Sequence, residues 1–503
     1  MTSRVYTATF LGIDGKLIEV ECDTSNGLPN LIIVGLGNKA IDEAKERVRS
    51  AIRNTKLDFP KKRITINLAP ANLPKDGSHL DLPIAIALLT VSGQLPLESI
   101  KDTLIVGELA LDGSVRSVRG IINFVETAKI NGFKRVIVPT DNADQATLVD
   151  GIEVLAVGSL KETFEHFAKM KTLSSTPRKT FTSTAGSSTL LSIRGQEQAK
   201  RALLIAASGG HNLLLSGPPG SGKTMLAKAL KEILPPPTTD QVIEMTKIHS
   251  LSSANYDQVI TERPFRSPHH SASHTSLVGG GRNPKPGEIS LAHHGVLCMD
   301  ELPEYSRQAL ESLRQPLEDR EISISRVSDH VVYPADFIFI ATQNPCPCGY
   351  LGDKKRNCSC TLAQIQLYKK KVSGPLLDRI DMIIDVGRVD LDKILDQTDS
   401  PNQTINEVRQ CVINARHIQE NRYKKQGSTN SHLRSDGVNK FAKLDQSSIV
   451  LLNQAANNLS LSARSYFKVI KVARTIADLE SSEAILPHHI SEALQFRLRS
   501  NSS

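Results

Sequence analysis

The eight residues GPPGSGKT, positions 217–224, constrain the fold more than any other part of this 503-residue chain. They follow an apolar run at 213–215 and precede a helix-like run at 225–233. A strand, a glycine-rich loop and a helix in this order form a phosphate-binding loop (P-loop), because backbone N–H groups and the helix N-terminus surround phosphate oxygens. The pattern therefore predicts an α/β domain that binds a nucleotide.

Each position of the P-loop has an expected task. Lys223 is expected to reach the β- and γ-phosphates, and the Thr224 hydroxyl is expected to coordinate Mg²⁺. The residues expected to contact the nucleotide are Gly217, Pro218, Pro219, Gly220, Ser221, Gly222, Lys223, Thr224 and Met225. ATP and Mg²⁺ are the expected cofactors, because chance seldom supplies all these parts in the right order.

A second apolar run, 295–299, ends in two adjacent carboxylates, Asp300 and Glu301. We expect Asp300 to hold the Mg²⁺ through water and Glu301 to polarise the attacking water. The alternative is that these carboxylates are only the polar end of a structural strand. The P-loop upstream makes this alternative less favoured. A third run, 337–341, precedes Thr342-Gln343-Asn344, where a polar side chain could orient the water beside the γ-phosphate.

The charge balance of the chain indicates what kind of partner it could bind. The chain has 61 Lys and Arg against 53 Asp and Glu, a formal net charge of +8. Residues 421–503 carry 12 basic and 6 acidic side chains, a local excess of +6. This fits a polyanionic partner such as DNA, and it also fits an ordinary basic solvated surface.

No segment predicts a membrane span or an export signal. The longest apolar run, 82–91, is shorter than the roughly 18 residues that a membrane helix needs. Residues 1–15 lack the basic start and apolar core of a secretory signal. We therefore expect a cytoplasmic protein with reduced cysteines and no membrane partner.

Periodicity and composition divide the chain into four expected segments. Residues 1–168 form an α/β domain, 169–189 a Ser- and Thr-rich flexible linker, 190–389 a second α/β domain with the P-loop, and 390–503 a helical lid. The strand-like runs of the first segment are 31–34, 64–68, 103–106 and 135–138, and its helix-like runs are 39–54, 83–91 and 121–131. The helix-like runs of the last segment are 391–395, 402–423, 447–459, 463–479 and 487–496.

Several further motifs carry a family resemblance. MDE at 299–301, ATQNPC at 341–346 and SGPLLDRID at 373–381, together with the P-loop, resemble the magnesium-chelatase-like group of AAA+ ATPases. RPFRSPHH at 263–270, LVGGG at 277–281 and SARSYFKVIKVARTIADL at 462–479 resemble the ComM/YifB family within that group. The resemblance covers nearly the whole chain. It implies a homo-hexamer with ATP bound between subunits.

The resemblance also implies site residues by position. Asn344 would be the sensor 1 residue, Arg379 the arginine finger and Arg464 the sensor 2 arginine of the helical lid. A guanidinium supplied by a neighbouring subunit stabilises charge that develops on the γ-phosphate and makes hydrolysis depend on the subunit interface. The alternative for Arg379 is a surface ion pair with Asp378 or Asp381. Arg474, on the same expected helix, is the second choice for sensor 2.

Two segments are expected to contact DNA. Seventy-five residues separate the P-loop from Asp300, so an insertion is expected, and 267–286 is interpreted as a mobile loop. The resemblance implies that this is a helix-2 insert in the pore of the ring, where Arg282 and Lys285 could contact phosphates. A hairpin is expected at 321–332, which the resemblance implies is a pre-sensor-1 hairpin with Arg326 as a third contact. Simple solvation of Arg326 is the equal alternative.

Four of the seven cysteines fall within 15 residues. They are Cys346, Cys348, Cys358 and Cys360. Four thiolates suffice for a closed tetrahedral Zn²⁺ site, whereas the one-residue gaps are shorter than usual and leave free thiols as the alternative. Because the cluster begins two residues after Asn344, a metal there could couple to the ATP site. The histidines of 269–293 show no regular ligand spacing and are interpreted as ordinary loop residues.

The first domain resembles the Lon protease domain, a ribosomal S5 domain 2-like fold, at ANLPKDGSHLDLP (71–83) and GELALDGSVRSVRG (107–120). That type of proteolysis needs a serine activated by a lysine. When the KDG triplets are superposed, His79 takes the serine's place and Ile122 the lysine's, although Ser78 is one residue away. We expect a degenerate domain used for assembly or DNA binding. Its candidate phosphate contacts, or else simply solvated residues, are Lys75, Arg116 and Arg119.

The resulting hypothesis, as the resemblance implies, is an ATP-driven hexameric DNA translocase or helicase. It would promote branch migration of recombination intermediates at branched DNA or junctions, in natural transformation. Two alternatives stay open: a magnesium-chelatase-type ATPase subunit, and an ATP-dependent protease or unfoldase. The P-loop and the carboxylate pair serve all three, because the hydrolysis chemistry is the same.

Overall fold

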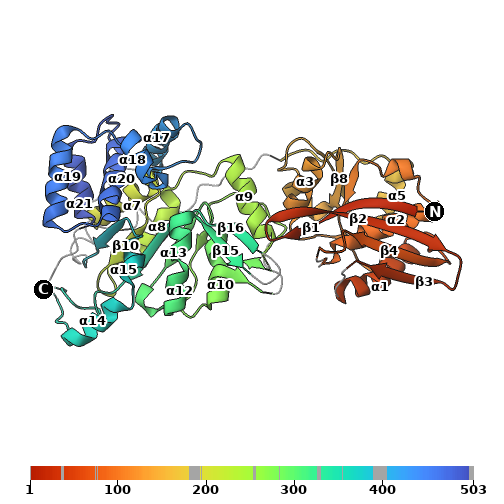
Figure 1. Ribbon diagram of the computed structural model, residues 1–503, viewed down its shortest axis with the longest axis horizontal. Helices are drawn as coiled ribbons and strands as arrows, with labels where there is room; N and C mark the ends of the chain where they lie inside the picture. The colour runs from red at the N-terminus through yellow and green to blue at the C-terminus, as the bar shows by residue number, and fades with distance from the viewer. Residues whose placement is uncertain are drawn as a thin grey trace.

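The chain contains two large sheets and a helical C-terminal region, arranged along one long axis (Figure 1). The computed structural model describes residues 2–35, 39–73, 75, 77–179, 193, 195–252, 256–281, 284–325, 330–353, 355–388 and 405–497. The seven-stranded sheet lies at the N-terminal end, and the C-terminal helices lie at the opposite end. Among the helices of the described residues, none is long and apolar enough to cross a membrane.

The first sheet is mixed, with the strand order β3-β4-β2-β1-β5-β8-β9. Its strands are β1 (Thr2–Leu11), β2 (Asp14–Ser25), β3 (Asn30–Val34), β4 (Arg63–Ala69), β5 (Thr103–Ile105), β8 (Arg135–Pro139) and β9 (Glu153–Val157). Its main helices are α1 (Lys39–Asn54), α2 (Asp81–Val91), α3 (Ile121–Ile130) and α5 (Leu160–Phe167). Every residue of α2 is buried, as its uninterrupted apolar run requires.

The four predicted strands and three predicted helices of this region are confirmed, whereas the long antiparallel hairpin β1–β2 was not predicted. Its signal is present in β2, where buried Ile18, Val20 and Cys22 alternate with more exposed neighbours. Such alternation at every second residue is typical of a strand with one buried face.

The second sheet is parallel throughout, with the order β11-β14-β17-β10-β18. Its strands are β11 (Phe265–Arg266), β14 (Val296–Met299), β17 (Ile338–Gln343), β10 (Leu213–Ser216) and β18 (Met382–Asp385). Leu213 and Leu215 face a core shared with α7 (Glu197–Gly209) and α8 (Lys223–Ile233), whereas Leu214 faces a separate core on the other side. Both faces are covered, as a parallel sheet requires.

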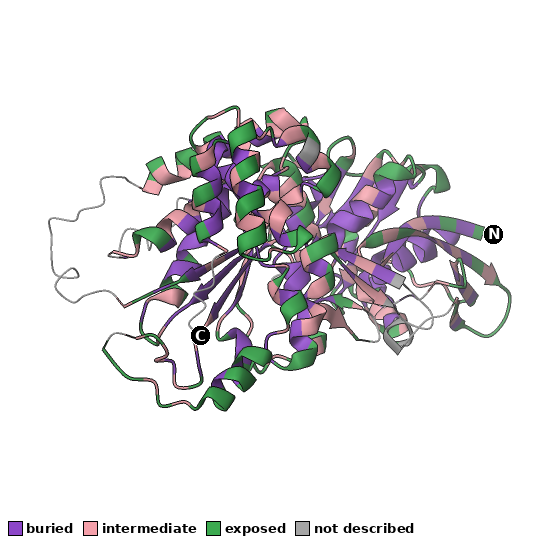
Figure 2. Cartoon of the chain, turned by 60° about the vertical axis from the view of Figure 1, so that its left-hand side comes forward, coloured by how far each residue is buried: buried purple, intermediate pink, exposed green. Residues whose placement is uncertain are grey.

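The C-terminal helices pack on the same core as α7 and α8, so the lid region and the second sheet share apolar contacts. These helices are α17 (Ile405–Tyr423), α18 (Ser435–Phe441), α19 (Gln446–Asn458), α20 (Ala463–Leu479) and α21 (Pro487–Gln495). Four of the predicted helices are confirmed, α18 was not predicted, and the run 391–395 lies outside the described residues. Figure 2 shows the buried faces of these helices turned inward and their exposed turns outward.

The predicted hairpin is present as β15 (Glu321–Ser325) and β16 (His330–Pro334). It packs against the β1–β2 turn of the first sheet, where Val331 and Tyr333 contact Phe10 and Ile13. A Cβ atom at Gly12 would lie 2.2 Å from Val331 Cγ1, so only glycine permits this approach. The hairpin therefore joins the two sheets.

The mobile loop expected at 267–286 is only partly correct. This segment contains the helix α10 (His274–Val278), whose Leu277 is fully buried in the core on the far face of the second sheet. The short strands β12 (Gly279–Gly280) and β13 (Lys285–Pro286) pair behind it. The segment is not a free loop because burial of Leu277 stabilises its position, although its other residues are mostly polar.

The first part of the expected flexible linker is anchored on the first sheet. The Thr176 N–H donates to the Val154 carbonyl at 2.9 Å, and Lys179 forms an ion pair with Asp144 at 2.8 Å. Residues 180–192 lie outside the described part of the chain. A flexible connection is thus a prediction for the later residues only.

Two arginines of α20 differ in burial. Arg474 is fully buried, and its guanidinium binds the Asp478 carboxylate and donates to the Ser482 carbonyl. Arg422 binds the same carboxylate. The Arg464 side chain, at the N-terminal end of the same helix, is 42% exposed. Arg474 therefore stabilises the helical region.

Replacing Arg474 with alanine is expected to lower the free energy of unfolding by about 3 kcal/mol, because it removes one partner of a buried ion-pair cluster. Arg464→Ala, on the same helix, is the matched control and should change it by less than about 1 kcal/mol. Urea unfolding followed by circular dichroism measures both. Equal effects of the two substitutions would contradict the assignment.

Candidate functional site

The P-loop lies at the carboxyl edge of the parallel sheet, between the end of β10 and the start of α8. Gly220 and Gly222 adopt left-handed backbone conformations with φ of 76° and 86°. A Cβ atom at Gly217 would lie 2.1 Å from the Val386 carbonyl oxygen, so the loop passes against the end of β18. Glycine is required at these positions because larger residues would clash or be strained.

Lys223 is held inside the loop. Its ammonium donates to the carbonyls of Gly217 at 2.7 Å and Pro218 at 2.9 Å, and to Asn344 Oδ1 at 3.2 Å. Burial lowers the pKa of Lys223, and the nearby carboxylates of Asp300 and Glu301 oppose this shift. The structure thus brings together two residues, Lys223 and Asn344, that lie 121 positions apart.

Asp300 is bound from two sides. Thr224 donates its hydroxyl to Asp300 Oδ2 at 3.1 Å, and Thr342 donates its hydroxyl to Oδ1 of the same carboxylate. The Thr342 oxygen also accepts the Glu301 N–H at 3.1 Å. The expected Mg²⁺ pair, Thr224 and Asp300, is therefore in contact, and Thr342 fixes its geometry through a contact that the sequence did not predict.

The sequence places Thr342 among three polar residues after a strand expected to end at Ala341, but nothing in that stretch pairs it with Asp300. β17 instead continues to Gln343. The register of β14 on β17 pairs Met299 with Ala341, which places Asp300 beside Thr342. Only the sheet register carries this information.

Glu301 has an unusual backbone. Its φ is 54°, in the left-handed region, and its side chain is exposed. This conformation costs a non-glycine residue about 1–2 kcal/mol, and such strain is concentrated at functional sites. The Glu301 carboxylate lies outside the apolar core and next to the expected Mg²⁺ pair.

Arg379 and Arg464 lie together at the opposite end of the strands. The two guanidinium groups bind the two carboxylate oxygens of Glu318, on α13 (Arg314–Asp319). The Arg379 carbonyl accepts from the side chain of Asn212, which immediately precedes β10. The four-residue strand β10, about 13 Å long, thus separates both arginines from their own P-loop.

The ion pairs considered for Arg379 from the sequence are wrong. Its partner is Glu318, 61 positions earlier, rather than Asp378 or Asp381. The Asp381 carboxylate instead binds Lys468 at 3.1 Å and accepts the Asn212 N–H at 2.9 Å. Packing against the start of β10 keeps Asp381 away from its neighbour in sequence.

A basic cavity of about 1050 Å³ opens beside these arginines. Its cationic lining includes Arg320, Arg379, Arg464, Lys468 and Lys471. Burial lowers the pKa of Lys468 to about 8, although the Asp381 carboxylate opposes that shift. A cluster of this charge suits an anion supplied from outside the chain.

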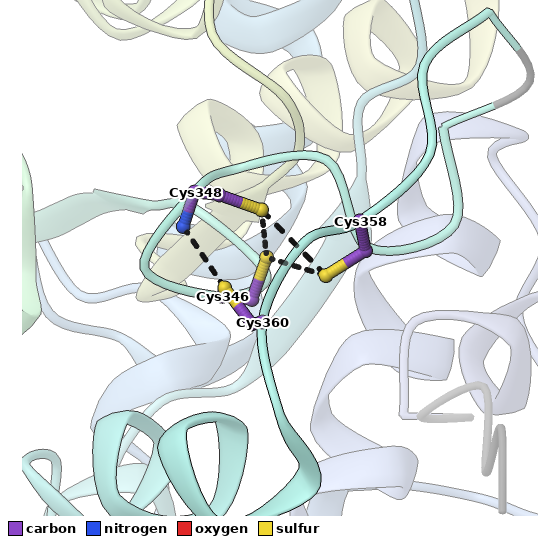
Figure 3. A group of neighbouring side chains, drawn as sticks. All are labelled: Cys346, Cys348, Cys358 and Cys360. Atoms are coloured by element: carbon purple, nitrogen blue, oxygen red, sulfur yellow. Dashed lines mark hydrogen bonds between the residues drawn. The ribbon is translucent and has the colours of Figure 1, made fainter.

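The four predicted cysteines meet in the loop between β17 and α14 (Leu362–Lys370), with their side chains pointing toward one another (Figure 3). The Cys346 sulfur lies 3.4 Å from that of Cys348 and 3.6 Å from that of Cys358. All four cysteines, Cys360 included, are free of disulfides, and their sulfur atoms lie within 4.8 Å of one another.

The histidines near the insertion do not form one cluster. His269 and His270 stack on each other, with ring centroids 4.1 Å apart. His293 and His294 both bind Glu244 through Nε2, at 3.1 and 2.6 Å. His293 accepts the Asp336 N–H at Nδ1, so its Nε2 carries the proton and donates to Glu244. This tautomer makes His293 a hydrogen-bond donor rather than a metal ligand.

The region that resembles the Lon protease lacks a serine–lysine pair among its described residues. His79 is buried and stacks on Phe124, with ring centroids 5.1 Å apart. Ser78 donates to the Glu108 carboxylate, and Ile122 is fully buried.

Lys75 is wrongly predicted as a phosphate contact. It is only 1% exposed, and its ammonium donates to the Pro70 carbonyl, because the loop folds over it. Arg116 is exposed and Arg119 lies over the Tyr256 ring at 5.3 Å. Of the three DNA-contact candidates of the insertion and hairpin, Lys285 is exposed, and Arg282 and Arg326 lie outside the described residues.

Three family descriptions match successive parts of the chain. "Subunit ChlI of Mg-chelatase" matches residues 20–142, "Magnesium chelatase, subunit ChlI" matches 189–394, and "Magnesium chelatase, subunit ChlI C-terminal" matches 402–497. The first of these falls in the seven-stranded sheet, the second contains the P-loop, and the third spans the C-terminal helices.

Individual relatives match over almost the full length. The chain is 43% identical to the uncharacterized protein YifB of Escherichia coli over 498 residues, which is 98% of this chain and 97% of YifB. It is 42% identical to the competence protein ComM of Haemophilus influenzae over 501 residues, again 98% and 97% of the two chains. A shorter match, 27% identical over 172 residues, joins 31% of this chain to 26% of the archaeal Lon protease of Methanocaldococcus jannaschii.

Thr342→Val is expected to lower the rate of ATP hydrolysis about tenfold, because residues that orient a metal-binding carboxylate contribute on that scale. The substitution keeps the β-branched shape of the side chain and removes only the hydroxyl. ATP binding without Mg²⁺ should stay at the wild-type level. A wild-type Mg²⁺ dependence of hydrolysis in this variant would contradict the role of Thr342.

Proposed function

This chain belongs to the ComM/YifB family of magnesium-chelatase-like AAA+ ATPases, and from that premise we propose that it is an ATP-driven, homo-hexameric DNA translocase that promotes branch migration of recombination intermediates. The observation that carries the ATPase part is the meeting of Lys223, Thr224, Asp300 and Asn344 at one sheet edge. The DNA part rests on the relative named a competence protein.

The proposed hydrolysis uses the carboxyl edge of the sheet. The P-loop amides and Lys223 bind the phosphates, and Thr224 and Asp300 hold the Mg²⁺ that ATP brings. Glu301 accepts a hydrogen bond from the attacking water, and Asn344 orients that water beside the γ-phosphate. These groups lie at one edge of a parallel sheet, which fixes their backbone positions relative to one another.

The hexamer is supported by the position of Arg379 and Arg464. Both lie across β10 from their own P-loop, so the phosphates they would stabilise are those of a neighbouring subunit. Arg379 is proposed as the arginine finger and Arg464 as the sensor 2 residue. The basic cavity beside them would receive the neighbour's nucleotide, which makes each ATP site a property of two subunits.

Two chain segments are proposed to reach DNA. The hairpin β15–β16 leads directly into β17, the strand that ends beside Asn344, so a change at the ATP site can move it. The insertion that carries β12 and β13 contributes exposed Lys285, with Arg282 and Arg326 as the further proposed contacts. Contacts to phosphates alone would bind DNA without sequence preference.

A magnesium-chelatase-type ATPase subunit is the second candidate, because the matching families carry that subunit's name. Its partner would be a tetrapyrrole-binding protein instead of DNA. An ATP-dependent protease has less support, since Ser78 binds Glu108 and His79 is buried. The four-cysteine cluster is proposed to hold a structural zinc ion in any of these motors.

Purified protein with ATP and Mg²⁺ is expected to resolve a fluorescent, movable four-way DNA junction. Lys223→Ala should do so at least about 100-fold more slowly, because the phosphates lose their main cationic partner. Gel separation of the junction and its products measures the rate. Junctions left intact, with no stimulation of ATP hydrolysis by DNA, would reject the DNA proposal in favour of the chelatase-type one.

Arg379→Ala is expected to lower ATP hydrolysis by about 10³-fold while leaving ATP affinity within about threefold of the wild type. Mixing this variant with Lys223→Ala subunits should restore part of the activity. Some interfaces of the mixed ring then combine an intact P-loop with an intact arginine. A mixture no more active than the separate variants would exclude action between subunits.

A further inference from the structure

We propose that the four-cysteine cluster binds one Zn²⁺ ion that braces the P-loop through Gly349, so that zinc occupancy sets the affinity for ATP. The cluster lies in the loop that leaves β17 after Asn344 and ends at α14 (Figure 3). The inference rests on the proposed nucleotide site and is independent of the DNA substrate. Its basis is the sulfur geometry together with one close contact between loops.

The sulfur geometry fits a single tetrahedral ion. Four sulfurs at about 2.3 Å from a zinc ion stand about 3.8 Å from one another. The sulfurs of Cys346, Cys348 and Cys358 are separated by 3.4, 3.6 and 3.6 Å, and Cys360 completes a set within 4.8 Å. These separations are far longer than a disulfide bond of about 2.05 Å.

An iron–sulfur cluster fits less well. Zinc and iron both accept four thiolates, but an iron–sulfur cluster places several atoms between its cysteine sulfurs. Here the sulfurs touch one another, which leaves space for a single ion. The short loop also pre-forms the site, because the Gly349 N–H donates to the Cys346 carbonyl at 3.0 Å.

A backbone donor orients one sulfur of the cluster. The Cys348 N–H points at the Cys360 sulfur, 3.4 Å away. Such outer hydrogen bonds orient metal ligands and reduce the charge on the sulfur. Nearby Arg356 and Arg388 both lie over the Tyr350 ring, so two cations flank the loop whose four thiolates would carry negative charge.

Gly349 connects the cluster to the P-loop. A Cβ atom there would lie 2.6 Å from Pro219 Cδ and 2.8 Å from Pro219 Cγ, and 3.8 Å from Asn344 Cγ. Its φ is 84°, which favours glycine. Gly349 follows Cys348 directly and lies three residues after Cys346, so two of the four ligands closely precede this contact.

A bound ion would therefore hold two parts of the nucleotide site at once. It would fix the backbone that contacts Pro219 of the P-loop, and the backbone that leads from Asn344, the residue bound to Lys223. Without the ion, the sulfurs take up protons and lose the bonds that tie them to one centre, so the loop loses this geometry. Loss of zinc should then weaken ATP binding before any effect on chemistry.

The first experiment measures metal content by atomic emission. Protein purified without chelator is expected to hold about one zinc ion per chain and no stoichiometric iron. Cys358→Ser with Cys360→Ser should lose it. Cys411→Ser, at an exposed cysteine outside the cluster, is the matched control and should keep it. Wild-type protein that holds no zinc and takes none up from a zinc-buffered solution would overturn the site.

The second experiment tests the contact between Gly349 and Pro219 separately from metal binding. Gly349→Ala keeps all four ligands but places a Cβ against Pro219, and is expected to weaken binding of a fluorescent ATP analogue about tenfold with zinc retained. Gly352→Ala is the matched control, because Gly352 has a similar φ of 78° and open space around it. It should change the affinity less than about twofold.

Two further outcomes decide the coupling. Zinc stripped from wild-type protein by a thiol-reactive mercurial and a chelator should weaken ATP binding to the same extent, and reduction with added zinc should restore it. Equal ATP affinities of Gly349→Ala and Gly352→Ala, or unchanged affinity of the zinc-free protein, would overturn the bracing role. Neither readout uses DNA, so failure here is distinct from failure of the translocase proposal.

Discussion

The parallel pairing of β10 with β17 and β18 is the constraint on which the rest of the structure depends. It places the P-loop and Asn344 at the carboxyl edge of one sheet, and Asn212 and Arg379 at its amino edge. Alternate residues of β10 face two cores, so a shift of this strand by one residue would exchange its buried faces.

Division of the functional groups between two sheet edges has a consequence for assembly. Lys223 and Asp300 lie at one edge, and Arg379 and Arg464 lie at the other, so in the proposed hexamer these arginines would serve the nucleotide of a neighbouring chain. Glu318 holds both arginines in one place. Under the proposed function, this arrangement would make hydrolysis depend on contact between subunits.

The same carboxyl edge is connected to the rest of the molecule through loops. Gly349 of the cysteine loop lies against Pro219 of the P-loop, and the hairpin β15–β16 leads into β17 while it packs on the β1–β2 turn. Gly12 and Gly349 permit these two contacts, because any larger side chain would collide with Val331 or Pro219. Two tight contacts therefore link the nucleotide site to the first sheet and to the cysteine loop.

Local patterns in the sequence determined the P-loop, the strand that ends in Asp300, the bounds of α1 and α20, the hairpin and the set of four cysteines, because each depends on residues close together in the chain. Tertiary structure alone decided that Thr342 binds Asp300, that Glu318 binds both Arg379 and Arg464, and that Lys75 is buried. Those contacts depend on sheet register and on the packing of distant elements, and periodicity along the chain carries no record of either.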